Sequence, residues 1–358
     1  MVTAIRQRFA YRFSWVGMLL WLLRIGVVLL VIVGSVNTLT SQKYTIDNWV
    51  SLFFSGLAQG SIYALIALGY TMVYGILRMI NFAHGEVFMA GAFSAFFVAS
   101  ATARSGFLDS NPWASIGIWL LVSMSVATLV AVLLERVAYR PLRNAPRLVT
   151  LITAIGASLF LQYTFRGLFG SNFRAYPEVA ILQGAVRILG FRVPIDQIFV
   201  ILAAIILMLG LNTFVERTKT GKSMRAVAED KEIAGLMGID VNRVIVITFV
   251  IGGLLAGAAG IFRGLYLPQG ISPFMGFLPG LKAFTAAVLG GIGSIPGAMV
   301  GGLILGLFES FGPNLILEGL GIEGANQLRD AIAIVLLVLV LIFRPQGIMG
   351  EKLSEEKA

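Results

Sequence analysis

The polar residues best placed to do chemistry lie at a break between two long apolar runs. His84, the only histidine, stands with Asn81 and Glu86 around Gly85. Ionisable groups near membrane depth are costly, so these residues are candidates for lining the path of a solute or for fixing a broken helix. The alternative is a hydrated position at a membrane surface, where they would be purely structural. One histidine without a cluster of ligands does not predict a metal site.

A second candidate is a glycine-rich break inside the apolar stretch 281–310. Gly290, Gly291, Gly293 and Pro296 interrupt the apolar pattern. Such residues break a helix unless neighbouring protein satisfies the freed backbone groups. We expect two half-helices that meet within the membrane, with ends that present N–H or C=O groups to a polar solute. The alternative is a tight packing bend.

Several other kinds of chemistry find no support in the sequence. The chain has no cysteine, which excludes disulfides, thiol catalysis and thiolate metal sites. It lacks the G-x-x-x-x-G-K-[ST] loop that cradles phosphates, and the G-x-S-x-G and H-E-x-x-H motifs of hydrolases. The formal charge of +9 is spread over short loops rather than gathered in one patch with stacking aromatics, which does not favour nucleic acid. A membrane enzyme is therefore the weakest interpretation.

The elements that must position these residues are membrane helices. Of the 358 residues, 58% are apolar and 13% charged, and the mean hydropathy is +0.88, so a bilayer must supply the solvent. A helix needs about 20 apolar residues to cross a core of about 30 Å. We expect an all-α polytopic bundle of about eight full spans plus a re-entrant or broken helix pair at 281–310. The eight spans cover residues 15–36, 49–76, 82–101, 114–135, 148–168, 197–215, 244–265 and 329–343.

The distribution of Lys and Arg predicts the orientation of these helices. Most of the 27 basic residues fall in five segments, which we place in the cytoplasm together with both termini. They are 1–14, 77–81, 136–147, 216–243 and the tail 344–358. The apolar run after the basic start is too long for a cleaved signal peptide, so we expect a retained first helix.

Segment 216–243 combines six basic and five acidic residues with a set of apolar positions near helical spacing. We interpret it as a short amphipathic helix, or helix pair, lying against the cytoplasmic face of the membrane. Such an element can dock into a groove on a soluble partner, although an interfacial helix without a partner shows the same pattern. The apolar positions are Met224, Val227, Ala228, Ile233, Ala234 and Met237.

Several ordered stretches resemble the permeases of branched-chain amino-acid ABC importers, the high-affinity leucine/isoleucine/valine type. Glu232-Ile-Ala-Gly-Leu-Met-Gly238 is similar to the cytoplasmic coupling loop of ABC-importer permeases, with Ile233 in place of the usual alanine. The resemblance covers nearly the whole chain after residue 49, so we divide it into an N-terminal extension with an extra helix (1–48), a permease core (49–343) and a cytoplasmic tail (344–358). The longer matching stretches are 56–75, 81–86, 135–143, 151–156 and 344–348.

This resemblance implies a transport subunit without an ATPase site of its own, in the inner membrane of a bacterium. It implies a second related permease or a second copy, two cytoplasmic ATPase subunits that use ATP and Mg²⁺, and a periplasmic substrate-binding protein, with no cofactor bound by this chain. The coupling loop would contact the ATPase. The residues expected there are Arg225, Glu229, Asp230, Glu232, Ala234 and Gly238, and those expected on the translocation path are Asn81, His84, Gly85, Glu86, Gly290, Gly291 and Gly293.

Two alternatives remain open from the sequence. Related permeases resemble one another closely, so the solute could be urea or a short amide. The chain could also be a secondary transporter or channel driven by an ion gradient. Against the second alternative, the apolar runs offer few paired acids or basic relays of the sort that proton or sodium coupling uses.

Overall fold

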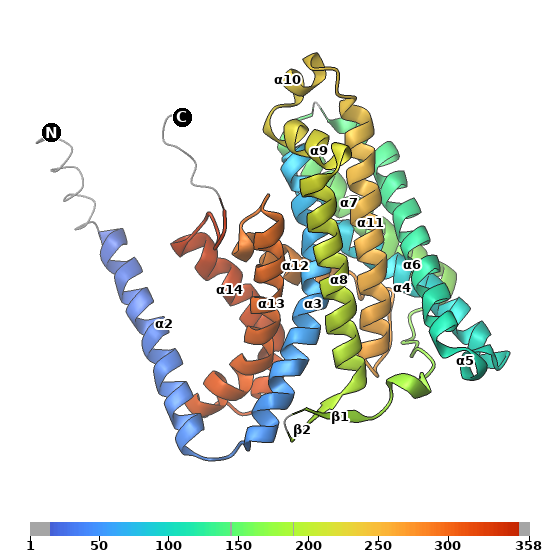
Figure 1. Cartoon of the computed structure of the whole chain (residues 1–358). Helices are drawn as coiled ribbons and strands as arrows, with labels where there is room; N and C mark the ends of the chain where they lie inside the picture. The colour runs from blue at the N-terminus through green and yellow to red at the C-terminus, as the bar shows by residue number, and fades with distance from the viewer. Residues whose placement is uncertain (1–14, 144, 189, 351–358) are drawn as a thin grey trace, which may run out of the picture.

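The computed structural model describes residues 15–350 except 144 and 189, and nearly all of them are helical (Figure 1). Among these described residues, nine helices are long and apolar enough to cross a membrane. Each of the eight predicted spans overlaps one of these helices, which confirms the all-α polytopic bundle. The basic start 1–14 and the last part of the tail, 351–358, lie outside the described residues.

The long helices follow the apolar runs of the sequence. Capping residues fix several of their starts, for example Thr45, whose hydroxyl accepts from the N–H of Asn48 (3.4 Å), and Asp240, whose carboxylate accepts from the N–H of Arg243 (3.0 Å). The long helices are α2 (Trp15–Thr40), α3 (Ile46–Leu77), α4 (His84–Arg104), α6 (Pro112–Leu134), α7 (Arg147–Phe169), α8 (Ile195–Arg217), α11 (Val241–Tyr266), α13 (Ile295–Gly312) and α14 (Arg329–Phe343).

Shorter elements connect these helices. A two-stranded antiparallel hairpin pairs Ala185 with Pro194 and Ile188 with Phe191. The remaining elements are the α-helices α5 (Phe107–Ser110), α9 (Lys219–Glu229), α10 (Lys231–Leu236) and α12 (Phe277–Gly290), the strands β1 (Ala185–Ile188) and β2 (Phe191–Pro194), the π-helices η1 (Glu135–Tyr139) and η4 (Pro313–Leu317), and the 3-10 helices η2 (Arg140–Leu142), η3 (Ala180–Leu182), η5 (Glu318–Leu320) and η6 (Ala325–Leu328).

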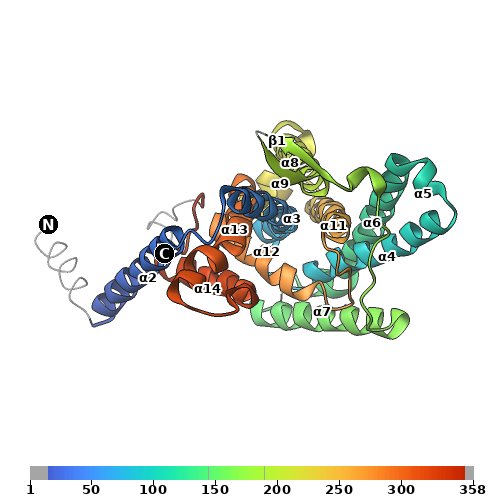
Figure 2. The same cartoon turned by 90° about the horizontal axis from the view of Figure 1, so that it is seen from below.

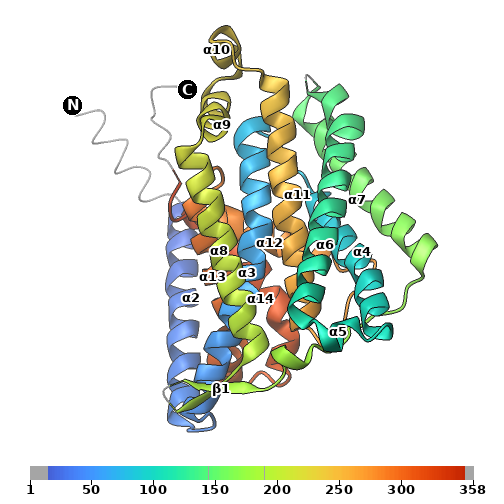
Figure 3. The same ribbon diagram turned by 45° about the vertical axis from the view of Figure 1, so that its right-hand side comes forward.

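The bundle has two distinct ends. α9 and α10 form a cap at one end, which we call the α9–α10 end, and the β1–β2 hairpin lies at the other, which we call the hairpin end (Figures 1 and 3). α3 runs through the middle and is flanked by α8, α11, α12 and α13 (Figure 2). The core is therefore built around α3, whose residues from Ile62 to Leu68 are fully buried.

Small residues bring α3 and α13 into backbone contact. An added Cβ at Gly60 would lie 2.8 Å from the carbonyl oxygen of Gly302, and one at Gly56 would lie 3.1 Å from that of Gly306. A side chain at Gly306 would collide with the backbone of Gly60. Gly56 and Gly60 are four residues apart on α3, and Gly302 and Gly306 are four residues apart on α13. The two glycine pairs pack against each other, as small residues at this spacing predict.

The stretch 281–310 differs from the expected pair of half-helices. α12 is short, with 14 residues, but α13 continues through η4 and η5, so that Ile295–Leu320 forms a complete candidate span. Pro313 does not end the span, because the helix continues beyond it as a π-helical turn, Pro313–Leu317, in which the N–H of Glu318 donates to the carbonyl of Pro313. Only α12 is therefore a half-helix, and it enters the bundle from residues 267–276.

The first helix, α2, stands at the edge of the bundle (Figures 1 and 2). Its contacts gather near the hairpin end, where Asn37 donates to the carbonyl of Gly319 (3.1 Å) and Lys43, just after the helix, pairs with Glu318 (2.8 Å). Most of its apolar side chains remain exposed on the chain surface. α2 is thus an attached element rather than a part of the core.

The contact between α3 and α13 makes a direct prediction about stability. Gly306→Leu would force α13 away from Gly60, and overpacking of this kind costs about 1–3 kcal/mol or more. We expect a lower unfolding temperature for the purified protein in detergent. The matched control is Gly156→Leu on α7, where nothing lies within 4 Å of an added Cβ. Equal unfolding temperatures for the two variants would contradict the described packing.

Candidate functional site

α4 begins inside the bundle rather than at its end. Arg78, just after α3, donates to the carbonyl of Ala228 in α9 (2.9 Å), which places it at the α9–α10 end. His84, the first residue of α4, packs against Gly69, where any side chain would collide with the imidazole ring. Gly69 lies eight residues before the end of α3, a depth of about 12 Å. Residues 78–83 therefore descend into the protein before the helix starts.

His84 is enclosed on several sides. Its ring lies edge-on to the ring of Tyr70, with 5.1 Å between centroids, and an added Cβ at Gly252 of α11 would lie 3.4 Å from its Cε1 atom. The side chain is only 2% exposed, and Nε2 has no hydrogen-bond partner among the described residues. A buried polar atom without a partner is unusual and is available to a polar group or water that enters.

Glu86, in the first turn of α4, joins three helices. Its Oε1 atom accepts hydrogen bonds from Gln162 (2.7 Å) and Ser158 (3.2 Å) of α7. Its Oε2 atom has no partner among the described residues and lies against Gly276, the residue just before α12. The starts of α4 and α12 therefore meet at this carboxylate.

Asn81 fixes the descending segment to α6. Its Oδ1 atom accepts a hydrogen bond of 2.5 Å from the hydroxyl of Tyr139, which is fully buried in η1, just after α6. Asn81 itself is 2% exposed and Glu86 is fully buried. The sequence-derived alternative, in which these residues lie at a hydrated surface, is therefore wrong for the described structure.

Gly290, Gly291 and Gly293 lie elsewhere, at the joint between α12 and α13. Gly291 and Gly293 have φ angles of +110° and +99°, which favour glycine. The carbonyls of Leu289 and Gly290 accept hydrogen bonds of 2.8 Å from the N–H groups of Ile348 and Met349. These two carbonyl groups are therefore occupied by the chain itself, and the joint matches the packing bend that the sequence also allowed.

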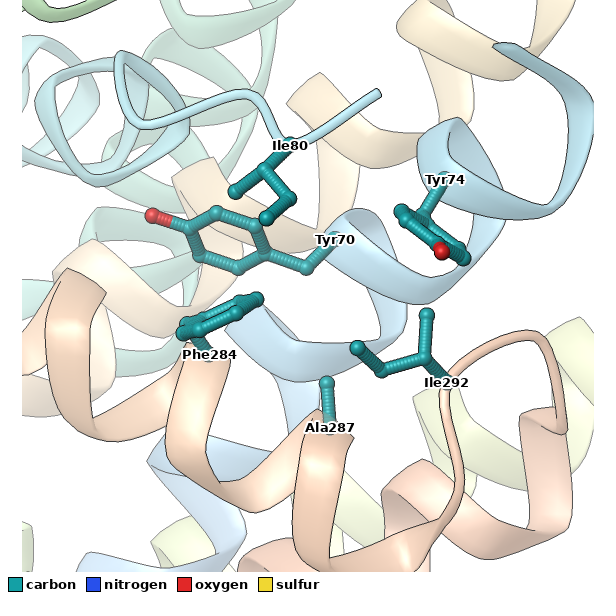
Figure 4. Close-up of a pocket in the computed structure, with 6 residues that line it drawn as sticks. All are labelled: Tyr70, Tyr74, Ile80, Phe284, Ala287 and Ile292. Atoms are coloured by element: carbon teal, nitrogen blue, oxygen red, sulfur yellow. The ribbon is translucent and has the colours of Figure 1, made fainter. Parts of the chain in front are cut away.

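A small pocket lies between the two candidate groups (Figure 4). Tyr70, which also packs on His84, forms one wall, and Ile292 of the α12–α13 joint forms another (Figure 4). The volume is about 10 Å³, room for roughly one water molecule. The groups around His84 and Gly291 are therefore separated by packed side chains in this conformation. The lining residues are Tyr70, Tyr74, Ile80, Phe284, Ala287 and Ile292.

The segment expected to contact a soluble partner forms two helices, α9 and α10, joined at Asp230. The carboxylate of Asp230 accepts from the N–H groups of Glu232 (2.8 Å) and Ile233 (2.9 Å) and so starts α10. Gly238 has a φ of +83° and lets the chain turn into α11. Arg225 donates to the carbonyl of Glu216 (3.2 Å). Ala234 is buried, whereas Glu229 and Glu232 are exposed.

α10 presents apolar side chains to its surroundings. Leu236 is 86% exposed and Met237, which follows α10, is 78% exposed, and Ile233 is exposed beside them. The amphipathic pattern placed Ile233 and Met237 on the covered face, and the structure places them on the opposite one. Met224, Val227 and Ala234, which belong to the same pattern, are buried on the covered face.

Three basic side chains, Lys231, Arg143 and Arg78, lie near one another beside α10. Partial burial lowers the pKa of the Lys231 ammonium, and the neighbouring charges of Arg143 and Arg78 lower it further. Arg143 is held in place by Glu135 and Asn242. The exposed acidic residues Glu229, Asp230 and Glu232 lie at the same place, so charges of both signs border the exposed apolar side chains of α10.

Comparison with known proteins decides the family. The family model described as the permease component of a branched-chain amino acid transport system matches residues 52–341, which include α4, the α9–α10 segment and α12. The chain belongs to this family. It is therefore one component of a transport system that contains other subunits. Its first helix, α2, lies outside the matched range.

Relatives of this permease match over most of their length. The high-affinity branched-chain amino acid transport system permease protein BraD of Pseudomonas aeruginosa is 44% identical over 85% of this chain and 97% of its own. The corresponding LivH protein of Escherichia coli is 42% identical over 83% and 94%. A probable branched-chain amino acid transport permease protein of Methanocaldococcus jannaschii is 29% identical over 81% and 89%.

Sequence reasoning missed several residues of the permease that hold the candidate site. Gln162, Ser158 and Tyr139 secure Glu86 and Asn81, but each comes from a helix far along the chain. Polar residues inside an apolar run are the available signal, because a polar side chain in a membrane helix needs a partner. A polar residue in an apolar run shows that a partner is needed, but it does not show which residue that partner is.

The hydrogen bonds of Glu86 lead to a prediction. Glu86→Leu would remove the shared acceptor of Gln162 and Ser158 and leave the Gln162 amide only its longer bond to the Ser158 hydroxyl (3.2 Å). Loss of a buried hydrogen-bond acceptor costs about 1–3 kcal/mol, so the unfolding temperature of the permease should fall. Glu86→Gln keeps the size and one acceptor and should cost less. The double variant Glu86→Leu/Gln162→Leu should lose less than the sum of its two single variants. Strict additivity in thermal unfolding would show that the two residues do not interact.

Proposed function

We propose that this permease is the membrane-spanning subunit of an ATP-driven importer for branched-chain or other neutral amino acids. The observation that supports this most directly is the 44% and 42% identity with high-affinity branched-chain amino acid permease proteins, along nearly their whole length. The names of those relatives favour amino acids over urea or a short amide as the solute.

The proposed transporter draws its energy from other chains. Two cytoplasmic ATPase subunits bind ATP and Mg²⁺, a second related permease or a second copy completes the membrane part, and a periplasmic protein delivers the substrate. This chain binds no cofactor and catalyses no reaction in this scheme. Its sequence supports that division, because it contains no phosphate-binding loop of the G-x-x-x-x-G-K-[ST] type.

The proposed location is a bacterial inner membrane, with the α9–α10 end and both termini in the cytoplasm. Basic residues support this orientation, since Arg78, Arg143, Lys231 and Arg243 all belong to loops or helix starts at that end. Loops rich in Lys and Arg remain on the cytoplasmic side of a membrane. The hairpin end then faces the periplasm and the binding protein.

The proposed mechanism transmits force from α9–α10 to the start of α4. ATPase closure pushes on α10 and moves α9, which is continuous with α8 and leads into α11. The Arg78–Ala228 hydrogen bond ties α9 to the segment that carries Asn81, His84 and Glu86. A displacement of α9 thus reaches the buried polar residues through covalent and hydrogen-bonded links. This mechanism places those residues beside the translocation path.

The exposed face of α10 gives the first test. In Leu236→Asp/Met237→Asp, charges replace the apolar side chains that would enter an ATPase groove, so the ATPase subunits should no longer co-purify with the permease. The matched control is Val186→Asp/Ile188→Asp in β1, which alters an exposed apolar pair at the opposite end. Retention of the ATPase by the α10 variant would contradict the assigned role of this helix.

Reconstitution into proteoliposomes gives the second test, and it distinguishes an ATP-driven importer from a secondary transporter driven by an ion gradient. We expect uptake of labelled leucine into proteoliposomes only when ATPase subunits, ATP and binding protein accompany this chain and its permease partner. Labelled urea should not accumulate under the same conditions. Accumulation of leucine by this chain alone under a proton or sodium gradient would establish a secondary transporter instead.

A further inference from the structure

A buried ion cluster joins α12, α13 and α14 inside the bundle. The ammonium of Lys282 lies 2.5 Å from the Oε1 atom of Glu309 and 2.5 Å from the Oδ1 atom of Asp330. Lys282 and Glu309 are 7% exposed, whereas the side chain of Asp330 is 53% exposed. The apolar runs gave little reason to expect such paired charges. The cluster is thus buried at one side and reaches the chain surface at the other.

The cluster leaves hydrogen-bonding capacity unused at both charges. The ammonium of Lys282 carries three protons, and the two carboxylates take two of them. The Oε2 atom of Glu309 is buried and has no partner among the described residues. Among the described residues, one N–H of the Lys282 ammonium and the Oε2 atom of Glu309 therefore have no hydrogen-bond partner, and the two groups lie side by side. A zwitterion has the complementary arrangement, a carboxylate for the donor and an ammonium for the acceptor.

Polar side chains line α3 on the side of this cluster. The Nζ atom of Lys282 lies 5.6 Å from the centre of the Tyr63 ring, and the hydroxyl of Tyr63 accepts a hydrogen bond of 2.6 Å from Gln59. One turn further, Ser55 is 2.7 Å from the hydroxyl of Tyr266. Ser55, Gln59 and Tyr63 are spaced by four residues and so form one row along α3.

This row leads towards a pocket at the hairpin end. The pocket has a volume of about 370 Å³ and is lined by Tyr266, the carboxylate-bearing residues Asp196 and Glu178, and the apolar side chains of Val179 and Leu182. A polar row that connects an outer pocket with a buried, half-satisfied ion pair is unusual in a membrane bundle, because polar groups there are costly unless they have a use.

We propose that Lys282 and Glu309 form a binding site for the charged ends of a zwitterionic amino acid on its way through the permease. Lys282 donates to the substrate carboxylate and Glu309 accepts from its ammonium, while Asp330 holds the lysine in place from the surface side. The proposal rests on the function proposed above and adds the residues that recognise the substrate class.

The test replaces the pair by apolar residues of similar length. Lys282→Met/Glu309→Met removes the two buried charges together, a change that folded proteins often tolerate. It leaves only Asp330, whose side chain is 53% exposed, without its ion-pair partner. Complete transporter with its ATPase subunits and leucine-loaded binding protein is reconstituted, and uptake of labelled leucine is measured at rising concentrations of loaded binding protein. The matched control, Lys43→Met/Glu318→Met, removes an ion pair near the surface at the hairpin end.

The expected result is a maximal uptake rate lower by roughly tenfold or more, with an unchanged half-saturating concentration of binding protein and normal recovery of the assembled complex. The control should transport at nearly the wild-type rate. Wild-type uptake by the double variant would overturn the proposal and leave the proposed function intact. Absence of leucine uptake by the wild-type transporter would overturn both.

A second variant keeps the proposal testable if the double variant does not assemble. Glu309→Gln keeps an acceptor for Lys282 and nearly the same volume but removes the negative charge that the substrate ammonium needs. We expect normal assembly and ATPase activity with leucine uptake reduced roughly tenfold or more. Normal uptake by Glu309→Gln would contradict the binding role, because a structural hydrogen bond alone would then be sufficient.

Discussion

A helix that begins inside a membrane leaves backbone N–H groups that water cannot reach, and protein must satisfy them. α4 and α12 both begin in this way, side by side at Gly85 and Gly276. The carboxyl group of Glu86 lies at their junction, with one oxygen against Gly276. Its bond to Gln162 then fixes α7 against the same point. The starts of α4 and α12 and the middle of α7 are thus joined at one buried carboxyl group.

The same junction connects the two ends of the proposed mechanism. The segment before α4 starts at Arg78, which is bonded to α9, and ends at His84, which is packed between α3 and α11. A push on the α9–α10 end therefore reaches the interior through a short stretch of chain rather than through long-range rearrangement. Away from the junction, the ion cluster at Lys282 is a second buried polar group, and it is the one that we propose for binding the substrate.

The spans were predictable because a run of apolar residues is a local property and the bilayer fixes its length. The backbone contact of α3 with α13 was predictable in kind, because Gly56 and Gly60 share one helix face with no side chains to separate the backbones. Contacts between segments far apart in the sequence were not predictable. The covering of the α12 end by Ile348 and the pairing of Lys282 with Glu309 depend on tertiary packing, which single-residue spacing does not encode. The outward face of α10 escaped prediction because one amphipathic pattern suits a membrane and a partner equally.

The link between the α9–α10 end and the interior can be measured directly by hydrogen–deuterium exchange of residues 78–86 in the complete transporter. We expect exchange in this segment to change when the ATPase subunits hold ATP, and we expect Arg78→Ala to abolish the change without preventing assembly. Unchanged exchange in residues 78–86 during ATP-driven transport would contradict the proposed link.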